Sequence, residues 1–264
     1  MKKVTIFKYY SFGHDYKLLL GRSKDDSIEH VLDDLNMFLE KIKELELRVT
    51  QSGIDQKKLN IEVEKLKKLV TEKKEKEKVP QNIISSIQTK LNKIDHILDA
   101  EIQLKDGYIL DEKRYSLIIL TERIDKLFSS ETFIKIPTIA QYDFKEAGMC
   151  LAFDRFTASA FHLLRGTEDV LRFFFETLLA KNSKITDTWG SYTIAINKEI
   201  QAKKLDPEPS KELMINIDNL RLFYRNTTQH PDKIYNQDEV QDLFGISIKT
   251  VNEIVSDLKK RKLI

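Results

Sequence analysis

The sequence predicts a mainly all-α protein, and three observations support this fold class. Charged residues make up 33% of the chain, whereas its 264 residues include only 8 glycines and 5 prolines. Apolar residues recur at alternating spacings of three and four over long stretches, as on the buried face of a helix. Capping residues and prolines stand where these stretches begin. A chain of this length can form one large domain or two smaller ones.

The composition limits the partners and compartments that we expect. The formal net charge is only +2, because 44 basic residues nearly cancel 42 acidic ones, so any phosphate-binding surface must be a local patch. Cys150 is the single cysteine, which rules out an intrachain disulfide. No apolar run approaches the roughly 18 residues that a membrane span needs, and no apolar export signal follows the N-terminal lysines. The sequence predicts a cytoplasmic protein with no membrane partner.

A small extended segment is predicted at residues 1–24. Val4, Ile6 and Lys8 begin an alternation of period two, and Phe12-Gly13 is a turn signal. We therefore expect short strands here, ahead of the helical part of the chain.

The next part of the chain carries three helical stripes. The first spans residues 28–49 as a heptad pattern and ends at Ser52-Gly53, the second spans residues 59–70, and Pro80 opens the third. This pattern predicts an antiparallel coiled-coil arm or a small bundle. Such an arm serves packing and dimerisation or, alternatively, docks a partner protein.

Residues 101–135 are expected to join the arm to the rest. Lys105-Asp106-Gly107 is a turn signal between short apolar runs. A short hairpin or a broken helix fits, and irregular extended segments are favoured. This places the domain boundary between an N-terminal helical region, residues 1–135, and a C-terminal domain, residues 136–264.

The C-terminal domain is predicted to be a bundle of four or five helices. Its expected helix starts are Pro137, Thr157, a position near residue 186, Ser210 and either Asn236 or Asp238. Gly245 lies inside the last of these helices and weakens the prediction that it is continuous.

One short segment between the last two helices carries residues suited to RNA cleavage. Arg225 and His230 are separated by four residues, and Pro231 stiffens the chain after them. A guanidinium can hold the scissile phosphate and stabilise charge in the transition state. An imidazole can move a proton to or from a 2′-hydroxyl or a leaving oxygen near neutral pH. RNA supplies its own nucleophile, so this chemistry needs no metal or other cofactor.

The spacing alone is weak evidence, because Arg155 and His162 also satisfy it. This second pair straddles a predicted helix start and continues into an amphipathic helix. We therefore interpret His162 as a packing residue.

Residues 223–231 resemble the signature of the HEPN superfamily, in which an Arg and a His are separated by four to six residues at the end of a four-helix bundle. Here Asn226 directly follows the Arg and Pro231 directly follows the His. Residues 141–148 and 158–168 extend the resemblance to bacterial HEPN-containing proteins. It covers about residues 137–264, and the N-terminal arm lies outside it.

The resemblance implies a metal-independent endoribonuclease that works as a homodimer, with two Arg–His motifs facing one another. By this carry-over Arg225 binds the phosphate, His230 transfers a proton, and Asn226 orients the site. HEPN ribonucleases are often toxins or anti-phage defence effectors of the abortive-infection type. The resemblance thus implies RNA as the substrate and leaves room for an antitoxin or another defence subunit docked on the arm.

Arg165, Glu168 and Tyr224 are further candidates for a supporting role. Arg165, Glu168 and Arg172 share a helical face as an ion-pair ladder, or else Arg165 and Glu168 lie beside the site, where Glu168 fixes Arg225 or His230. Tyr224 either stacks on a base or packs in the core. Two other functions remain open: a catalytically inactive HEPN-like scaffold that binds RNA or a partner protein, and a structural coiled-coil protein.

Overall fold

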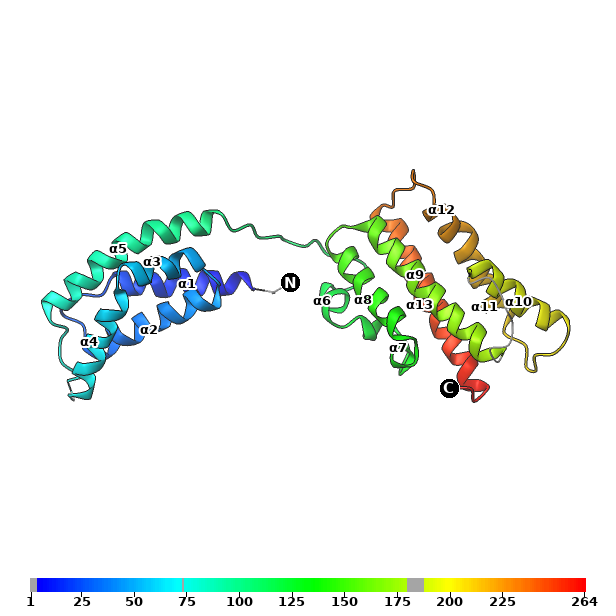
Figure 1. Cartoon of the computed structure of the whole chain (residues 1–264), viewed down its shortest axis with the longest axis horizontal. Helices are drawn as coiled ribbons and strands as arrows, with labels where there is room; N and C mark the ends of the chain where they lie inside the picture. Colours follow the sequence, from blue (N-terminus) through cyan, green and yellow to red (C-terminus); the bar gives the residue numbers. More distant parts are fainter. Residues whose placement is uncertain (1–3, 73, 180–187) are drawn as a thin grey trace. The chain divides into compact units, whose positions relative to one another are not determined.

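The computed structural model describes residues 4–72, 74–179 and 188–264, and within these ranges the protein is all-α (Figure 1). Helices account for 73% of the structure, and no strand occurs among the described residues. The chain divides into two compact units, Met1–Tyr108 and Ile109–Ile264. None of the helices in the described ranges combines the length and apolar character that crossing a bilayer requires.

In its described residues, the first unit is a bundle of five helices with its own apolar core. These helices are α1 (Ile6–Leu20), α2 (Ile28–Glu44), α3 (Arg48–Gln56), α4 (Leu59–Thr71) and α5 (Gln81–Gln103). The heptad stripe of α2, including Val31, Leu35 and Ile42, is buried inside this unit. Because these residues pack against helices of their own chain, the predicted arm is a small bundle. Its stripe is not available for a coiled coil with another chain.

The prediction of strands at residues 1–24 is wrong, because Ile6–Leu20 of this segment form α1 and no strand occurs in its described residues. Phe12, Tyr16 and Leu19 are buried at spacings of four and three. The rings of Phe12 and Tyr16 stack on Phe38 of α2 at centroid distances of 6.1 and 5.1 Å. Contact with α2 therefore selects the helical period over the short alternation at the start of the segment.

The first predicted stripe also breaks at a different place. The helix ends after Glu44, and Glu46 takes a left-handed backbone conformation with φ of 55°. Gly53, expected to end the helix, lies inside α3, where an added Cβ would stand 2.7 Å from Cδ1 of Ile97. This glycine lets α3 approach α5 closely and does not break the helix.

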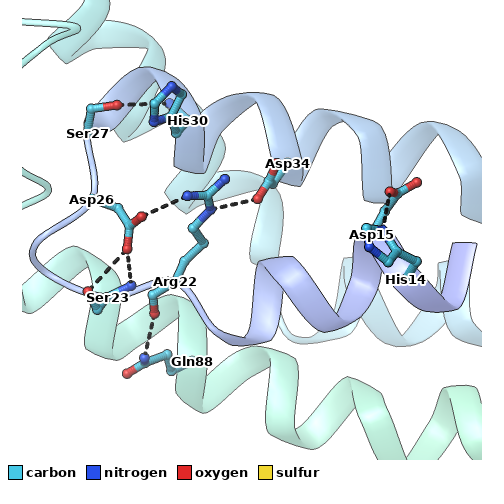
Figure 2. Close-up of polar contacts among 9 residues, drawn as sticks. All are labelled: His14, Asp15, Arg22, Ser23, Asp26, Ser27, His30, Asp34 and Gln88. Carbon is cyan, nitrogen blue, oxygen red and sulfur yellow. Dashed lines mark hydrogen bonds and ion pairs between the residues drawn. The ribbon is translucent and has the colours of Figure 1, made fainter. Parts of the chain in front are cut away.

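A polar network fixes the connection between α1 and α2 (Figure 2). The guanidinium of Arg22 donates to Asp26 and to Asp34, each at 2.7 Å. Asp26 in turn accepts from the backbone N–H of Ser23 at 2.8 Å, and Gln88 of α5 donates to the carbonyl of Arg22 at 3.0 Å. These bonds hold the turn against α2 and α5.

Glu101 of α5 caps α3 from the side. Its carboxylate accepts the backbone N–H groups of Val49 and Thr50, at 3.1 and 2.7 Å, and so pairs donors that the first turn of a helix leaves free. Burial by itself would raise the pKa of Glu101, but the hydrogen bonds from Thr50 and Val49 outweigh burial and hold this pKa below its usual range.

We expect this cap to make the first unit sensitive to acid. A carboxyl whose pKa is lower in the folded chain stabilises the fold above its unfolded pKa, and this stabilisation is lost as the pH falls through the folded value. Glu101→Gln should cost about 1.5 kcal/mol at pH 7 and weaken the fall in stability below about pH 4.5. Hydrogen exchange of the Val49 and Thr50 amides measures the effect. An unchanged exchange rate in the variant at pH 7 would contradict it.

The second unit is built around α9 (Figure 1). Helices α8 and α13 both pack against α9, as do α10 and η2. The bounds of the elements are α6 (Leu117–Glu122), η1 (Ile124–Leu127), α7 (Thr132–Lys135), α8 (Thr138–Ala152), α9 (Phe156–Leu178), α10 (Trp189–Gln201), α11 (Lys211–Asn219), η2 (Leu220–Arg225), α12 (Asn226–Thr228) and α13 (Gln237–Lys260).

The boundary between the units lies earlier than the one predicted at residues 135 and 136. The extended segment predicted within residues 101–135 does follow α5, but α6, η1 and α7 come after it. Leu120, Ile124, Phe128 and Phe133 belong to the core of the second unit. These side chains pack against apolar residues of the C-terminal bundle. The boundary therefore lies between residues 108 and 109.

The helix starts of the C-terminal domain agree closely with prediction. Pro137 precedes α8, Ser210 caps α11, and Asn236 caps α13 with Glu239 completing a capping box. The cap of α9 is Arg155, two residues before the predicted Thr157. Helix α13 is continuous through Gly245. The predicted end of the helix at Lys181-Asn182 lies outside the described residues.

Candidate functional site

Arg225 lies near the end of a single helical run formed by α11, η2 and α12 (Figure 1). The run widens into a π-helical turn over Leu220–Arg225, a feature often found at functional sites. The segment after Arg225, predicted as a loop, begins as one more helical turn. Two threonines fix this turn: the hydroxyls of Thr227 and Thr228 both donate to the carbonyl of Tyr224, at 2.9 and 2.6 Å.

The loop that follows is fastened to α9. Thr228 is buried, and its hydroxyl bonds the phenol oxygen of Tyr235 at 2.7 Å. The backbone N–H of Tyr235 donates to the hydroxyl of Thr157 at 3.1 Å. The loop that carries His230 is therefore anchored at both ends, at Thr228 and at Tyr235.

A groove of about 320 Å³ lies between α9 and the turn that carries Arg225. It is lined by Phe161, His162, Leu164, Arg165, Glu168, Arg225, Thr228 and Gln229. Two guanidinium groups, one imidazole and one carboxylate thus share a space of the size that a small ligand occupies.

Arg225 is only loosely paired in this groove. Its Nη2 lies 3.6 Å from Oε1 of Glu168, which is longer than a hydrogen bond. Its Nε is buried and has no hydrogen-bond partner within the described parts of the chain. Glu168 instead accepts the backbone N–H of Trp189 at 3.0 Å. Because Nη2 has no hydrogen bond to Glu168, the Nη end of the guanidinium retains donors that an anion in the groove could use.

Arg165 and His162 meet on one carboxylate. Asp143 of α8 is fully buried and accepts from Nε of Arg165 at 2.7 Å and from Nδ1 of His162 at 2.8 Å. Nη2 of Arg165 also donates to it, which makes the Arg165 pair a two-pronged contact. The buried charge of Asp143 is thus balanced, and it holds both groove side chains in place.

The ion-pair ladder considered for α9 does not form. Arg165 pairs with Asp143 and Arg172 pairs with Asp169, which leaves Glu168 facing Arg225. The structure therefore has the alternative arrangement, in which Arg165 and Glu168 line the groove together with Arg225.

The other predicted site residues lie outside the groove lining. His230 and Asn226 are exposed, and neither lines the groove. Tyr224 packs against the core of the unit, and burial raises its pKa. The structure therefore brings Arg225, Glu168 and Arg165 together, but not His230 of the same chain.

His162 and Asp143 were not among the predicted site residues. His162 was expected to be a packing residue, whereas its ring lines the groove and its side chain is 25% exposed. A signal for Asp143 was present: it interrupts an apolar face formed by Ala140, Phe144 and Ala147. An acidic residue on a buried face must have partners, and those partners are the groove residues.

The groove can bind an anion and move a proton. No group of three or more potential metal-ligating side chains is found in residues 4–72, 74–179 and 188–264. Arg225 and the outer edge of Arg165 offer N–H donors to a phosphate, and the imidazole of His162 supplies a ring nitrogen that can take or give a proton. Comparisons of the chain with protein-family models, with curated proteins and with solved structures found no match.

Proposed function

We propose that the protein is a metal-independent endoribonuclease in which Arg225 binds the scissile phosphate. The observation that carries this proposal is the Arg225 guanidinium, which lines an open groove with its Nη2 3.6 Å from Oε1 of Glu168, too far for a hydrogen bond. A phosphate entering the groove would accept hydrogen bonds from the Nη groups of Arg225. The adjacent imidazole of His162 makes the same groove suitable for acid–base chemistry.

In this reaction the 2′-hydroxyl of the RNA attacks the neighbouring phosphorus and the bond to the 5′-oxygen breaks. The products are a 2′,3′-cyclic phosphate and a 5′-hydroxyl. Arg225 stabilises the additional negative charge of the transition state. His230 protonates the leaving oxygen.

The exposure of His230 fits a site shared between two copies of the chain. Because His230 does not line the groove of its own subunit, we propose a homodimer in which the partner's His230 faces Arg225. A toxin or defence effector that cleaves RNA is the proposed biological setting. In that setting the first unit, Met1–Tyr108, is the surface for an antitoxin or another defence subunit.

Incubation of the purified chain with a short RNA in EDTA tests the proposal. We expect cleavage that leaves a 2′,3′-cyclic phosphate, and His230→Ala should slow it by about 100-fold or more. Cleavage that needs added metal, or that leaves a 3′-hydroxyl, would overturn the proposal.

A second candidate is a scaffold that binds RNA without cutting it. The position of His230 outside the groove favours this alternative if the chain is a monomer. RNA binding that depends on Arg225, together with no cleavage in EDTA or with metal, would support it. Sedimentation of the protein alone determines whether the dimer forms.

A further inference from the structure

His162 is oriented in a way that packing alone does not require. Its Nδ1 donates to the buried carboxylate of Asp143 at 2.8 Å, while its ring lines the groove with Arg225. With Nδ1–H held by a carboxylate, the neutral ring carries its free lone pair on Nε2. This tautomer is the one that can accept a proton from a bound ligand.

Asp143 does not need His162 for its own stability. Arg165 contacts both carboxylate oxygens, through Nε and Nη2, and so balances the buried charge. The contact with His162 adds a third charge-assisted bond to a carboxylate that is already paired. Its structural effect is to fix the orientation of the imidazole at the groove wall.

We propose that His162 is the general base of the ribonuclease site and that Asp143 is its positioning residue. This inference rests on the proposed function and adds to it a proton acceptor from the same subunit as Arg225. Asp143 from α8 contacts Nδ1 of the imidazole, and the charged groups that line the groove with it are Arg165 and Glu168 from α9 and Arg225 from η2.

The proposed reaction transfers one proton from the attacking oxygen and one proton to the leaving oxygen. Nε2 of His162 takes the proton of the 2′-hydroxyl as that oxygen bonds to phosphorus, and the ring becomes an imidazolium held by Asp143. The bond from phosphorus to the 5′-oxygen breaks, and this oxygen receives a proton from the general acid that the proposed function assigns to His230. This transesterification thus begins with a neutral imidazole at His162 and a protonated imidazole at His230.

Two substrates distinguish the loss of a general base from the loss of a general acid. The first is a short RNA, and the second is the same RNA with sulfur replacing the 5′-oxygen at one linkage. A thiolate leaves without prior protonation, because the pKa of a thiol, about 8.5, is far below that of an alcohol. Loss of a general acid should therefore be rescued by the sulfur substrate, and loss of a general base should not be.

We expect His162→Gln to cleave both substrates about 100-fold or more slowly than the wild type. His230→Ala should be slow only on the ordinary RNA. Wild-type cleavage of the ordinary RNA by His162→Gln would overturn the inference and leave the proposed function standing. Recovery of His162→Gln on the sulfur substrate would also overturn it, because His162 would then serve the leaving group. A wild-type protein that cleaves neither substrate would overturn both proposals.

Asp143→Asn tests the positioning role with a readout that is separate from activity. In the wild type, ¹⁵N NMR of the imidazole should show the proton on Nδ1 when the ring is neutral. In Asp143→Asn the preference for Nδ1–H should weaken, and cleavage should slow while the fluorescence of Trp189 remains native. An unchanged tautomer in the variant would exclude Asp143 as the positioning residue.

Discussion

Arg225→Ala should lower the rate of RNA cleavage by about 100- to 1,000-fold, the effect of removing one preorganised donor from a transition state. The guanidinium is positioned by the π-helical turn of η2 and stands beside Glu168 without a hydrogen bond to it. The variant removes both the charge and the donors that a phosphate would use. Arg225→Lys should recover only part of the rate, since a lysine restores the charge but not the planar fork.

Arg221→Ala is the matched control for this prediction. Arg221 lies one turn earlier in η2, and its side chain is 31% exposed, as is that of Arg225. It pairs with Asp218 and does not line the groove. The control should cleave RNA at close to the wild-type rate. Equal losses in the Arg221 and Arg225 variants would show that the effect is general damage to the helix.

Gly148→Ala should destabilise the second unit by about 2–3 kcal/mol, as expected for overpacking in a dense core. Gly148 lies in α8 where α6 crosses it, and an added Cβ would stand 2.4 Å from the carbonyl oxygen of Leu120. It would also stand 2.9 Å from Cδ1 of Ile124. A backbone oxygen cannot move aside as a flexible side chain can, so the two helices must separate. Denaturant unfolding followed by the fluorescence of Trp189, the single tryptophan, measures this unit.

Gly245→Ala provides the comparison within the same unit. Gly245 lies inside α13, and an added Cβ would be 3.5 Å from the phenol oxygen of Tyr115, an ordinary contact distance. This substitution should stabilise the unit by about 0.5–1 kcal/mol, because alanine favours helix more than glycine does. Destabilisation by Gly245→Ala as large as that of Gly148→Ala would contradict the clash with α6.

The sequence determined most of the helices, because apolar periodicity and capping residues are local signals. Asn236 with Glu239 and Ser210 mark helix starts that the structure confirms. The sequence did not determine α1 or the boundary between the units. Both depend on which distant surface a short apolar segment meets: Phe38 for α1, and the C-terminal bundle for Leu120 and Phe128.

The candidate site, too, could be predicted only in part from the sequence. Arg225 and Glu168 could be selected from residue type and spacing, and the structure places both in one groove. The pairing of Asp143 with His162 could not be read in advance, because these residues lie on different helices and only the packing of α8 on α9 brings them within 2.8 Å. Local sequence thus sets where helices form and which side chains they carry. Tertiary packing decides which of those side chains face each other, because ion pairs and grooves depend on distances between separate elements.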